Sequence, residues 1–404
     1  MVAGGCGVAA MAGVGAGAEI AEGHRVHGLA HELAAPDWAK LTVAEVSPIL
    51  ACFAGIGAVE AIAWHSPRPL AASALVACAG GIFFVKRHHR VVRGVADLAE
   101  EHAFLAYLRK RGACVPALLA SRGGLTAIAS GDATYEVHTM AAGDDLYRDA
   151  VSWSPFTSTA HARAAGRALA ALHRAAGGFA APPRATGLLV ADFRIFGAAD
   201  PMAALAGRVA AEPLLAGALA DRPWQADIAG ALLPWHARLA PHLPALTPLW
   251  THNDFHASNL LWHGDGSVAG VIDFGLANVT SAAFDLATAI ERNGVEWLRL
   301  ADGATDIAHA DLAAALIAGY CEIRPLPPGQ AAALPHLLPL VHAEFALSEL
   351  AYFHGVLGSQ EKADLAYHDF LLGHAGWFAT GHGRNFLRSV GNVVQQQDCW
   401  STIV

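Results

Sequence analysis

The stretch Thr251–Asp273, THNDFHASNLLWHGDGSVAGVID, decides how this chain folds. It holds two apolar runs, Leu260–Trp262 and Val268–Ile272, with the sequence GDGS between them. Short apolar runs joined by a glycine-rich turn are typical of a β-hairpin. The stretch therefore predicts a hairpin whose two ends both lead into polar residues.

Carboxylate and amide side chains stand at the ends of this predicted hairpin. Asp254 and Asn259 precede its first strand, and the returning strand is expected to bring Asp273 beside Asn259. Mg²⁺ prefers oxygen ligands, so we expect Asn259 and Asp273 to bind the magnesium ions of a nucleotide. Phosphoryl transfer depends mostly on positioning and charge neutralisation, and Asp254 is expected to hold and partly deprotonate the receiving hydroxyl.

These segments resemble the catalytic core of protein-kinase-like enzymes, and specifically the aminoglycoside phosphotransferase family with its choline-kinase-like relatives. The segment His252–Asn259, HNDFHASN, is similar to that family's H-G-D-x-H-x-x-N loop. Ile272–Gly275, IDFG, is similar to its metal-binding I-D-F/W segment, and Asp285–Ala287 matches the D-L-A that follows. The resemblance runs from about Trp64 to Asp285, and loosely to about Ala379.

The resemblance implies an α+β, bilobal protein-kinase-like fold. Its N-lobe would hold a small antiparallel sheet with one helix, and its C-lobe would be larger and mainly helical. We place a flexible tail at residues 1–35, the nucleotide-binding N-lobe at 36–140 and the catalytic and acceptor-binding C-lobe at 141–404. By the same resemblance, His252 and Asp285 support the catalytic loop.

The N-lobe is expected to supply the groups that orient the phosphates. Predicted strands and a helix follow one another at Val59–Trp64, Ala72–Cys78, Ile82–Lys86 and Val95–Lys110. Lys86 ends an apolar strand and fits the kinase lysine that contacts the α- and β-phosphates. By resemblance its partner is Glu101, which stands four residues before Leu105 and seven before Leu108. The other interpretation of Lys86 is a solvated position in the charged run KRHHR.

One feature of kinases is missing from this part of the sequence. The glycine loop G-x-G-x-x-G does not occur between the first two predicted strands, where residues 66–73 read SPRPLAAS. Gly55-Ile56-Gly57 is a partial match but precedes the first strand. The sequence therefore leaves open which backbone amides hold the phosphates.

The rest of the chain is expected to complete the sheet and build a helical lobe. Strands are predicted at Thr126–Ser130 and Tyr135–Thr139, followed by a hinge at Met140–Leu146. Helices are predicted at His161–Ala175, Ala203–Ala220, Gln225–Leu239, Ala308–Ile323 and Ala331–Tyr352. By resemblance, the helices around the catalytic loop shape the acceptor pocket. Glu344 and Glu349 would give it only a mildly acidic character, which favours a neutral or singly charged acceptor over a polycation.

Composition narrows the choice of partners. The chain has 404 residues and a net charge of −9, which argues against nucleic acid as the main partner. Its six cysteines are scattered without a C-x-x-C, which predicts free thiols and a cytoplasmic location. The apolar run Leu70–Val85 has 16 residues, too few to span a membrane. The first 35 residues lack the basic region of a signal peptide.

The acceptor is expected to be a small molecule. The 12 positions from Asp273 to Asp285 contain no A-P-E, whereas protein kinases place a longer, peptide-docking segment there. We therefore predict an ATP- and Mg²⁺-dependent kinase of a small-molecule hydroxyl, with the choice between a housekeeping substrate and a drug left open. The main alternative is a catalytically inactive nucleotide-binding protein of the same fold. A zinc site at His252 and His256 is disfavoured because Asn253 occupies the position of the catalytic glutamate.

Overall fold

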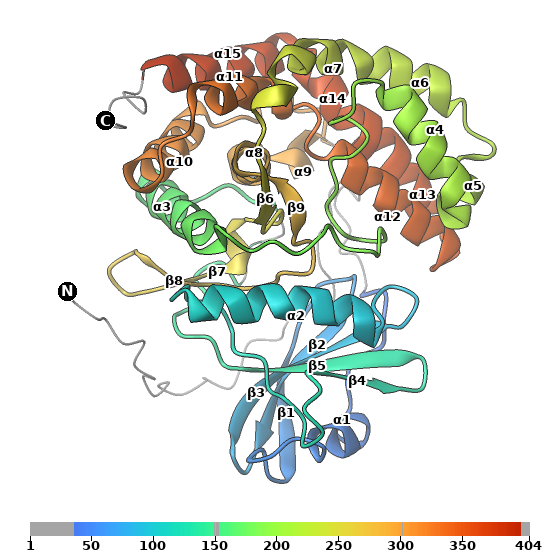
Figure 1. Cartoon of the computed structure of the whole chain (residues 1–404), viewed down its shortest axis with the longest axis vertical. Coiled ribbons are helices and arrows are strands. Elements are labelled where there is room, and N and C mark those ends of the chain that lie inside the picture. The colour runs from blue at the N-terminus through green and yellow to red at the C-terminus, as the bar shows by residue number, and fades with distance from the viewer. Residues whose placement is uncertain (1–35, 149, 151–152, 301, 397–404) are drawn as a thin grey trace. The chain divides into compact units, whose positions relative to one another are not determined.

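The computed structural model describes residues 36–148, 150, 153–300 and 302–396. The predicted tail at residues 1–35 lies outside these ranges. The chain forms two compact units (Figure 1). Of the described residues, those before Trp153 together with Leu260–Ile272 make the first unit, and Trp153–Asn259 together with those from Asp273 onward make the second.

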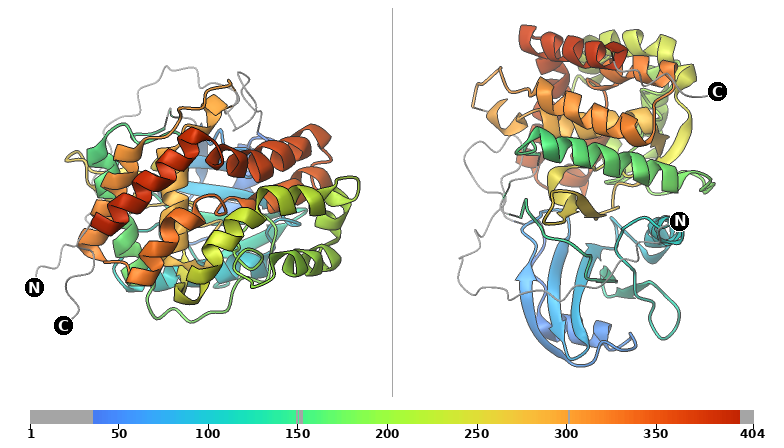
Figure 2. Two further views of the ribbon diagram at one scale, coloured as in Figure 1. Left: turned by 90° about the horizontal axis from the view of Figure 1, so that it is seen from above. Right: turned by 90° about the vertical axis from the view of Figure 1, so that its left-hand side faces the viewer.

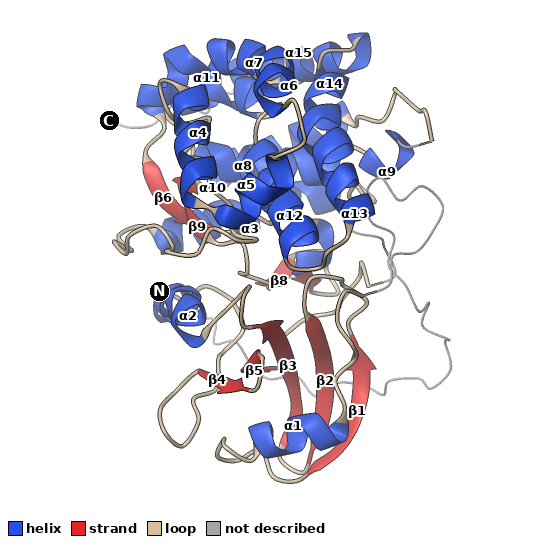
Figure 3. Cartoon of the chain, turned by 90° about the vertical axis from the view of Figure 1, so that its right-hand side faces the viewer, coloured by secondary structure: helices blue, strands red, loops and turns tan. Residues whose placement is uncertain are grey.

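The first unit is built on a five-stranded antiparallel sheet with the strand order β1-β2-β3-β5-β4 (Figure 3). Its elements are α1 (Val43–Leu50), β1 (Val59–His65), β2 (Ala72–Cys78), β3 (Gly81–His89), α2 (Val95–Lys110), β4 (Ala127–Ser130) and β5 (Ala133–Thr139). The predicted α+β class and the predicted strands of this sheet are confirmed, and α1 is an addition that the sequence did not indicate.

Alternation of side chains gives the sheet two different faces. Val76, Val85 and Val137 point to one face and form a buried core with Val46 and Leu50 of α1. Lys86 is paired with Glu136 across β3 and β5, so both lie on the other face. His102 of α2 hydrogen bonds Glu136, which places α2 on that second face.

The hairpin predicted from Thr251–Asp273 is present. It consists of β7 (Leu260–Trp262) and β8 (Val268–Val271), with Leu260 opposite Val271. By its contacts the hairpin belongs to the first unit, where Asp144 exchanges backbone hydrogen bonds of 2.8 and 2.9 Å with Trp262. The polar residues that flank the hairpin belong to the second unit.

The second unit is mainly helical. Its strands β6 (Pro248–Thr251) and β9 (Asn278–Ser281) pair antiparallel, with Thr251 opposite Asn278. Its principal helices are α3 (Thr159–Ala176), α4 (Pro201–Ala211), α5 (Pro213–Leu219), α6 (Trp224–Ala231), α7 (Leu233–Leu239), α8 (Ala282–Gly294), α9 (Trp297–Leu300), α10 (Ala310–Ile323), α11 (Pro328–Leu337), α12 (Ala343–Gly355), α13 (Gln360–Leu365), α14 (His374–Phe378) and α15 (Gly381–Gln396). It also contains two short 3-10 helices, η1 (Ala240–Ala245) and η2 (Ala257–Asn259), and a π-helix, η3 (Ala366–Gly373).

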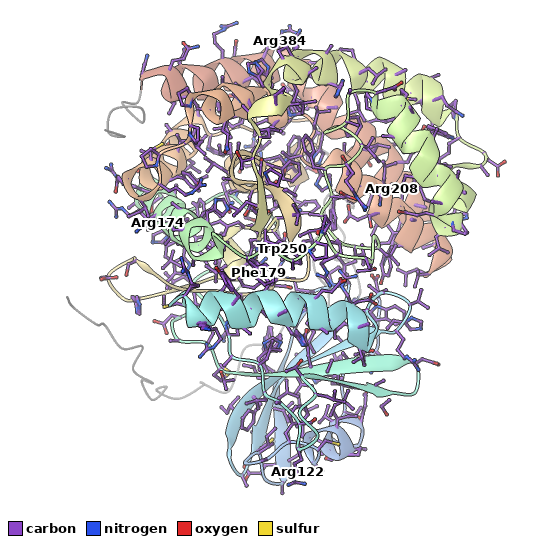
Figure 4. The ribbon with its side chains drawn as sticks, viewed as in Figure 1. Arg122, Arg174, Phe179, Arg208, Trp250 and Arg384 are labelled. Atoms are coloured by element: carbon purple, nitrogen blue, oxygen red, sulfur yellow. The ribbon has the colours of Figure 1, made fainter. Side chains whose placement is uncertain are left out.

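Helices α3 and α10 lie side by side (Figure 2). Two glycines permit this close approach. A Cβ at Gly166 would lie 2.1 Å from the Leu316 carbonyl oxygen, and one at Gly319 would lie 1.9 Å from that of Arg163. Helix α3 also contacts the strand β6, where Trp250 packs edge-on against Phe179, which follows α3 in the chain, with ring centroids 5.2 Å apart (Figure 4).

Three predicted helices are each interrupted. The helix predicted at Ala203–Ala220 is two helices, α4 and α5, bent by 111°. The break falls at Glu212–Pro213, since proline lacks an N–H and disfavours a helical residue before it. Gln225–Leu239 likewise divides into α6 and α7 before Pro234, and Ala331–Tyr352 divides around Pro339.

Two other expectations can be compared with the structure. Among the described residues, no single helix is both long and apolar enough to cross a membrane, although α4 and α5 pass that test as a bent pair. The expectation of free thiols holds for Cys52, Cys78 and Cys114 but is wrong for Cys321, which is disulfide-bonded. Sequence spacing could not show this, because disulfide partners meet only in the fold.

Candidate active site

The loop that follows β6 is held by one buried carboxylate. Asp285, in the first turn of α8, accepts backbone hydrogen bonds from His252 (2.9 Å) and Asn253 (2.8 Å). Its Oδ2 also lies 2.9 Å from His173 Nε2, and His173 Nδ1 lies 2.7 Å from the Tyr320 hydroxyl. Asp285 is completely buried, so its charge is balanced by these donors, and the loop backbone is fixed in place.

Asn253 adopts a left-handed backbone conformation with φ of 61°. Asparagine tolerates this conformation better than most residues, which explains how it stands where the resembling motif has glycine. Its buried side chain also joins β6 to β9: Oδ1 accepts hydrogen bonds from the Thr251 and Thr280 hydroxyls, both at 2.9 Å. Asn253 therefore supplies both the turn before Asp254 and an anchor for it.

Asp254 is surrounded by polar partners from its own loop and from α8. Asn259 Nδ2 donates to the Asp254 carbonyl (2.9 Å) and to its Oδ2 (3.1 Å). Arg292 forms an ion pair with Oδ1, and His256 Nε2 lies 3.6 Å from the same oxygen. With Arg292 on one oxygen and Asn259 on the other, the carboxylate has a fixed orientation.

Asn259 and Asp273 stand at the two ends of the hairpin. Because the Asn259 amide nitrogen faces Asp254, its carbonyl oxygen is the atom that this residue can offer to a cation. Asp273 is exposed and has a left-handed φ of 59°, which is uncommon for a residue other than glycine and recurs at functional sites. Oxygen donors from a carboxylate and an amide fit a hard divalent cation such as Mg²⁺.

The segment after Asp273 is packed against the loop that follows β6. The Phe274 ring meets the His252 ring edge-on at 4.6 Å between centroids. Arg184 is buried and donates to the Gly275 carbonyl at 3.1 Å, while its own backbone N–H donates to Asn278 Oδ1 at 2.8 Å. Aromatic packing therefore holds the loop against the segment carrying Asp273, and Asn253 Nδ2 adds a hydrogen bond of 3.4 Å to the Leu276 carbonyl.

The phosphate-orienting candidates lie in the first unit. Lys86 is half-buried on β3, on the sheet face against which α2 packs, and Glu101 is buried on α2 beside His102. Both candidates thus belong to the same helix–sheet interface. The glycine pair Gly55 and Gly57 does not form a phosphate loop in this unit, since the Ile56 carbonyl accepts the Gly80 N–H (2.8 Å) at the β2–β3 turn.

Glu136 forms a buried cluster with three histidines at that interface. Its carboxylate oxygens lie 3.0 Å from His88 Nε2, 2.7 Å from His102 Nε2 and 3.2 Å from His138 Nε2. Burial alone would raise the pKa of Glu136, but the three imidazoles hold it well below its usual range. Burial lowers the pKa of His88. This cluster could not be predicted from local sequence because its members come from β3, α2 and β5.

The two glutamates expected in an acceptor pocket have different environments. Glu344 is buried and accepts backbone hydrogen bonds of 2.9 to 3.0 Å from residues 194–196, so it anchors that segment. Glu349 is also buried, but its Oε2 has no hydrogen-bond partner among the described residues. Glu349 interacts electrostatically with Arg292. Of the two glutamates, Glu349 is therefore the one that interacts with Arg292, which in turn forms the ion pair with Asp254.

Arg292 is the main site residue that the sequence analysis missed. Its guanidinium carbon lies 5.6 Å from the ring centre of Trp153 and 5.7 Å from that of Phe345. Burial lowers its pKa to about 10, so it remains protonated at neutral pH. A signal was present, because Arg292 follows Asp285 by seven residues and shares its face of α8. Asn293, next on the helix, holds the loop through Phe255 O (2.9 Å) and Ala257 N (2.8 Å).

This chain is similar to known phosphotransferases in sequence and in fold. The model of the phosphotransferase enzyme family matches residues 73–334. A homoserine kinase of Methylobacterium radiotolerans is 32% identical over 196 residues, which cover 47% of this chain and 51% of the relative. One of Phenylobacterium zucineum is 34% identical over 198 residues, covering 49% and 53%. The chain therefore spans about half the length of the curated relatives it matches.

Solved structures show the same fold at low sequence identity. A spectinomycin phosphotransferase in complex with ADP and spectinomycin has a TM-score of 0.50 and 11% identity, covering 89% of this chain and all of that one. A microcompartment-associated aminopropanol kinase has a TM-score of 0.50 and 18% identity, covering 87% and 99%. These similarities confirm the predicted kinase-like fold.

Proposed function

The chain belongs to the phosphotransferase enzyme family, and from that premise we propose that it transfers the γ-phosphate of ATP to a hydroxyl of a small molecule. The observation that carries this proposal is the arrangement around Asp254. Its carboxylate is oriented by Asn259 and Arg292, on a loop that Asp285 holds through two backbone hydrogen bonds. An oriented carboxylate of this kind can accept the proton of an acceptor hydroxyl.

The other predicted residues would serve the nucleotide. Asn259 and Asp273 would hold a divalent cation through their oxygen atoms, and a bound cation neutralises charge on the phosphates. Lys86 would contact the α- and β-phosphates, with Glu101 orienting it from α2. Because both ligand atoms are oxygens, we propose Mg²⁺ as the cation that binds here during turnover. His252 and Asp285 would keep the loop geometry constant without touching the reactants.

We further propose that the acceptor is a small hydroxy amino acid, with homoserine as the first compound to test. Arg292 supports this proposal, because a guanidinium is well suited to bind a carboxylate with two hydrogen bonds. The rings of Trp153 and Phe345 flank the guanidinium. When an acceptor carboxylate binds Arg292, the Asp254 carboxylate would be released to face the acceptor hydroxyl. The names of the curated relatives agree with an acceptor of this class.

The test is a screen of ATP consumption by the full chain. Homoserine is compared with 3-aminopropan-1-ol, which retains the amine and the hydroxyl but lacks the carboxylate, and with aminoglycosides. We expect homoserine to be phosphorylated with a kcat/KM at least ~10-fold higher than that of the amino alcohol, since charged hydrogen bonds contribute about 1.5–3 kcal/mol. Equal kcat/KM values for homoserine and the amino alcohol would show that the enzyme does not recognise the carboxylate of its acceptor.

A complementary measurement separates this enzyme from an inactive nucleotide-binding protein. Phosphorylated product is identified by mass, and Asp254→Asn serves as the matched negative control. Binding of Mg-ATP without turnover of any hydroxyl compound, by protein whose fold is confirmed by circular dichroism, would favour the inactive alternative.

A further inference from the structure

A second cluster of potential ligands lies beside Arg292. Glu291, His342 and His374 each offer one ligand atom, and these atoms all lie within 4.8 Å of one another. All three side chains are buried. They come from different elements: Glu291 from α8, His342 from the residue before α12, and His374 from the start of α14.

The rings of the two histidines are held by packing. His374 Nδ1 lies 2.8 Å from Glu291 Oε1. The His374 ring stacks on Trp297, with centroids 3.8 Å apart and planes inclined by 7°. It also stacks on His342, with centroids 4.6 Å apart and planes inclined by 26°. The aromatic neighbours restrict how far either imidazole can turn, so the nitrogen atoms are directed by the surrounding fold.

One atom of this cluster and one atom beside it are buried without a hydrogen bond. Among the described residues, neither His342 Nε2 nor Glu349 Oε2 has a hydrogen-bond partner, although the two atoms lie only 3.6 Å apart. An unsatisfied buried polar atom costs about 1–3 kcal/mol. Ligand atoms of a tetrahedral zinc ion stand roughly 3.3 Å from one another, given metal–nitrogen distances near 2.05 Å. A bound cation would satisfy both atoms at close to their present separation.

The charges of the cluster favour a cation. Glu291 and Glu349 place two carboxylates in one buried region, where an uncompensated charge is costly. Arg292 interacts electrostatically with Glu349, but the same guanidinium forms the ion pair with Asp254. Its single positive charge therefore faces carboxylates from two sides. Two imidazole nitrogens and carboxylate oxygens suit zinc and similar transition metals better than Mg²⁺.

We propose that Glu291, His342 and His374 bind a divalent transition-metal cation of the zinc type, with Glu349 as the fourth ligand. The ligand set leaves no open coordination position, which is the mark of a structural metal site. The ion would join α8 to α12 and α14. Because Glu291 is next to Arg292 on α8, the same ion would also fix the part of the helix that contacts Asp254.

The test uses the full chain after dialysis against a chelator. Binding of Zn²⁺ and Co²⁺ is measured without nucleotide and with millimolar Mg²⁺, which competes at sites made of oxygen ligands. We expect one equivalent of bound Zn²⁺, an intense visible absorption from bound Co²⁺, and a higher melting temperature with Zn²⁺. His342→Gln should weaken binding by at least ~10-fold, which is the effect of losing even an outer-shell partner. His263→Gln, at an exposed position in the hairpin turn, is the control and should bind normally.

Glu349→Gln is the second variant, because it preserves the size of a side chain that contributes only one of four ligands. It should fold and still bind Zn²⁺ at least ~10-fold more weakly than the wild type. Wild-type protein that binds much less than one equivalent of Zn²⁺ would overturn the proposal, whatever the variants do. Equal affinity in wild type, His342→Gln and Glu349→Gln would overturn it as well, by placing the bound ion elsewhere.

Discussion

Arg292 forms an ion pair with Asp254, although the two residues lie 38 positions apart in the chain. The contact joins α8 to the loop that follows β6, and α8 also supplies Asp285 to the backbone of that loop. One helix therefore positions the loop and balances the charge of its central carboxylate.

Arg292→Gln should weaken the binding of a carboxylate-bearing acceptor more than that of other acceptors, and it should lower kcat for all of them because Arg292 also orients Asp254. We expect KM for homoserine to rise by ~10- to 100-fold, since a charged hydrogen bond contributes about 1.5–3 kcal/mol. KM for 3-aminopropan-1-ol should stay unchanged. Steady-state kinetics with both compounds measure the difference, and Arg299→Gln, at a half-exposed arginine of α9, is the control. An equal rise in KM for both acceptors would show that Arg292 holds the loop in place and does not bind the acceptor carboxylate.

Asp254→Asn should remove turnover and retain nucleotide binding. The amide cannot accept the proton of the acceptor hydroxyl, and a general base contributes typically 10²- to 10⁴-fold to the rate. We expect kcat to fall by that amount and the Kd for Mg-ATP to change by no more than a few fold. Single-turnover kinetics and calorimetry provide the two values. Activity close to that of the wild type would show that another group holds the hydroxyl.

Asp273→Ala should abolish the part of ATP binding that depends on Mg²⁺. Asp273 is exposed at the end of the hairpin. Without its carboxylate the metal ion would lose one of its ligands, and the negative charge of the phosphates would be less compensated. Calorimetry with ATP, in the presence and absence of Mg²⁺, measures the effect. Asp265→Ala removes a carboxylate from the hairpin turn and should bind Mg-ATP normally. If both variants retain the wild-type response to Mg²⁺, the ion is held elsewhere.

The hairpin, the order of the catalytic motifs and most strands of the first unit could be predicted from local sequence. Short apolar runs bounded by glycine are local signals, and Lys110 is both the predicted and the observed end of α2. His173 and the Glu136 cluster were not predicted because their partners lie far away in the sequence, whereas Arg292 was missed although its spacing from Asp285 places both on one face of α8. The helix breaks at Pro213 and Pro234 could have been predicted, since proline ends helices by a local steric effect.

The cluster around Glu136 should make the stability of the first unit depend on pH. The pKa of Glu136 is lowered in the folded state, so its stabilising contribution is present above its unfolded pKa of about 4.3 and is lost as pH falls below it. His88, whose pKa is also lowered, adds a loss of stability below about pH 6.5. Glu136→Gln should therefore melt at a lower temperature than the wild type near pH 7, with a gap that narrows below about pH 4.3. Calorimetric scans across this range test the sign, and a gap independent of pH would contradict it.

Asn253 offers a test that separates backbone conformation from side-chain hydrogen bonding. Asn253→Gly keeps access to the left-handed conformation but loses the bonds to Thr251 and Thr280. Asn253→Ala loses the same bonds and adds the cost of a Cβ in that conformation, about 1–2 kcal/mol. We therefore expect both variants to melt at lower temperatures than the wild type, and the alanine variant to be the less stable of the two. Its kcat should also fall further, because the strained turn leads directly into Asp254. Thermal unfolding and kinetics of the two variants decide this, and an alanine variant as stable and active as the glycine variant would show that the left-handed turn is not required.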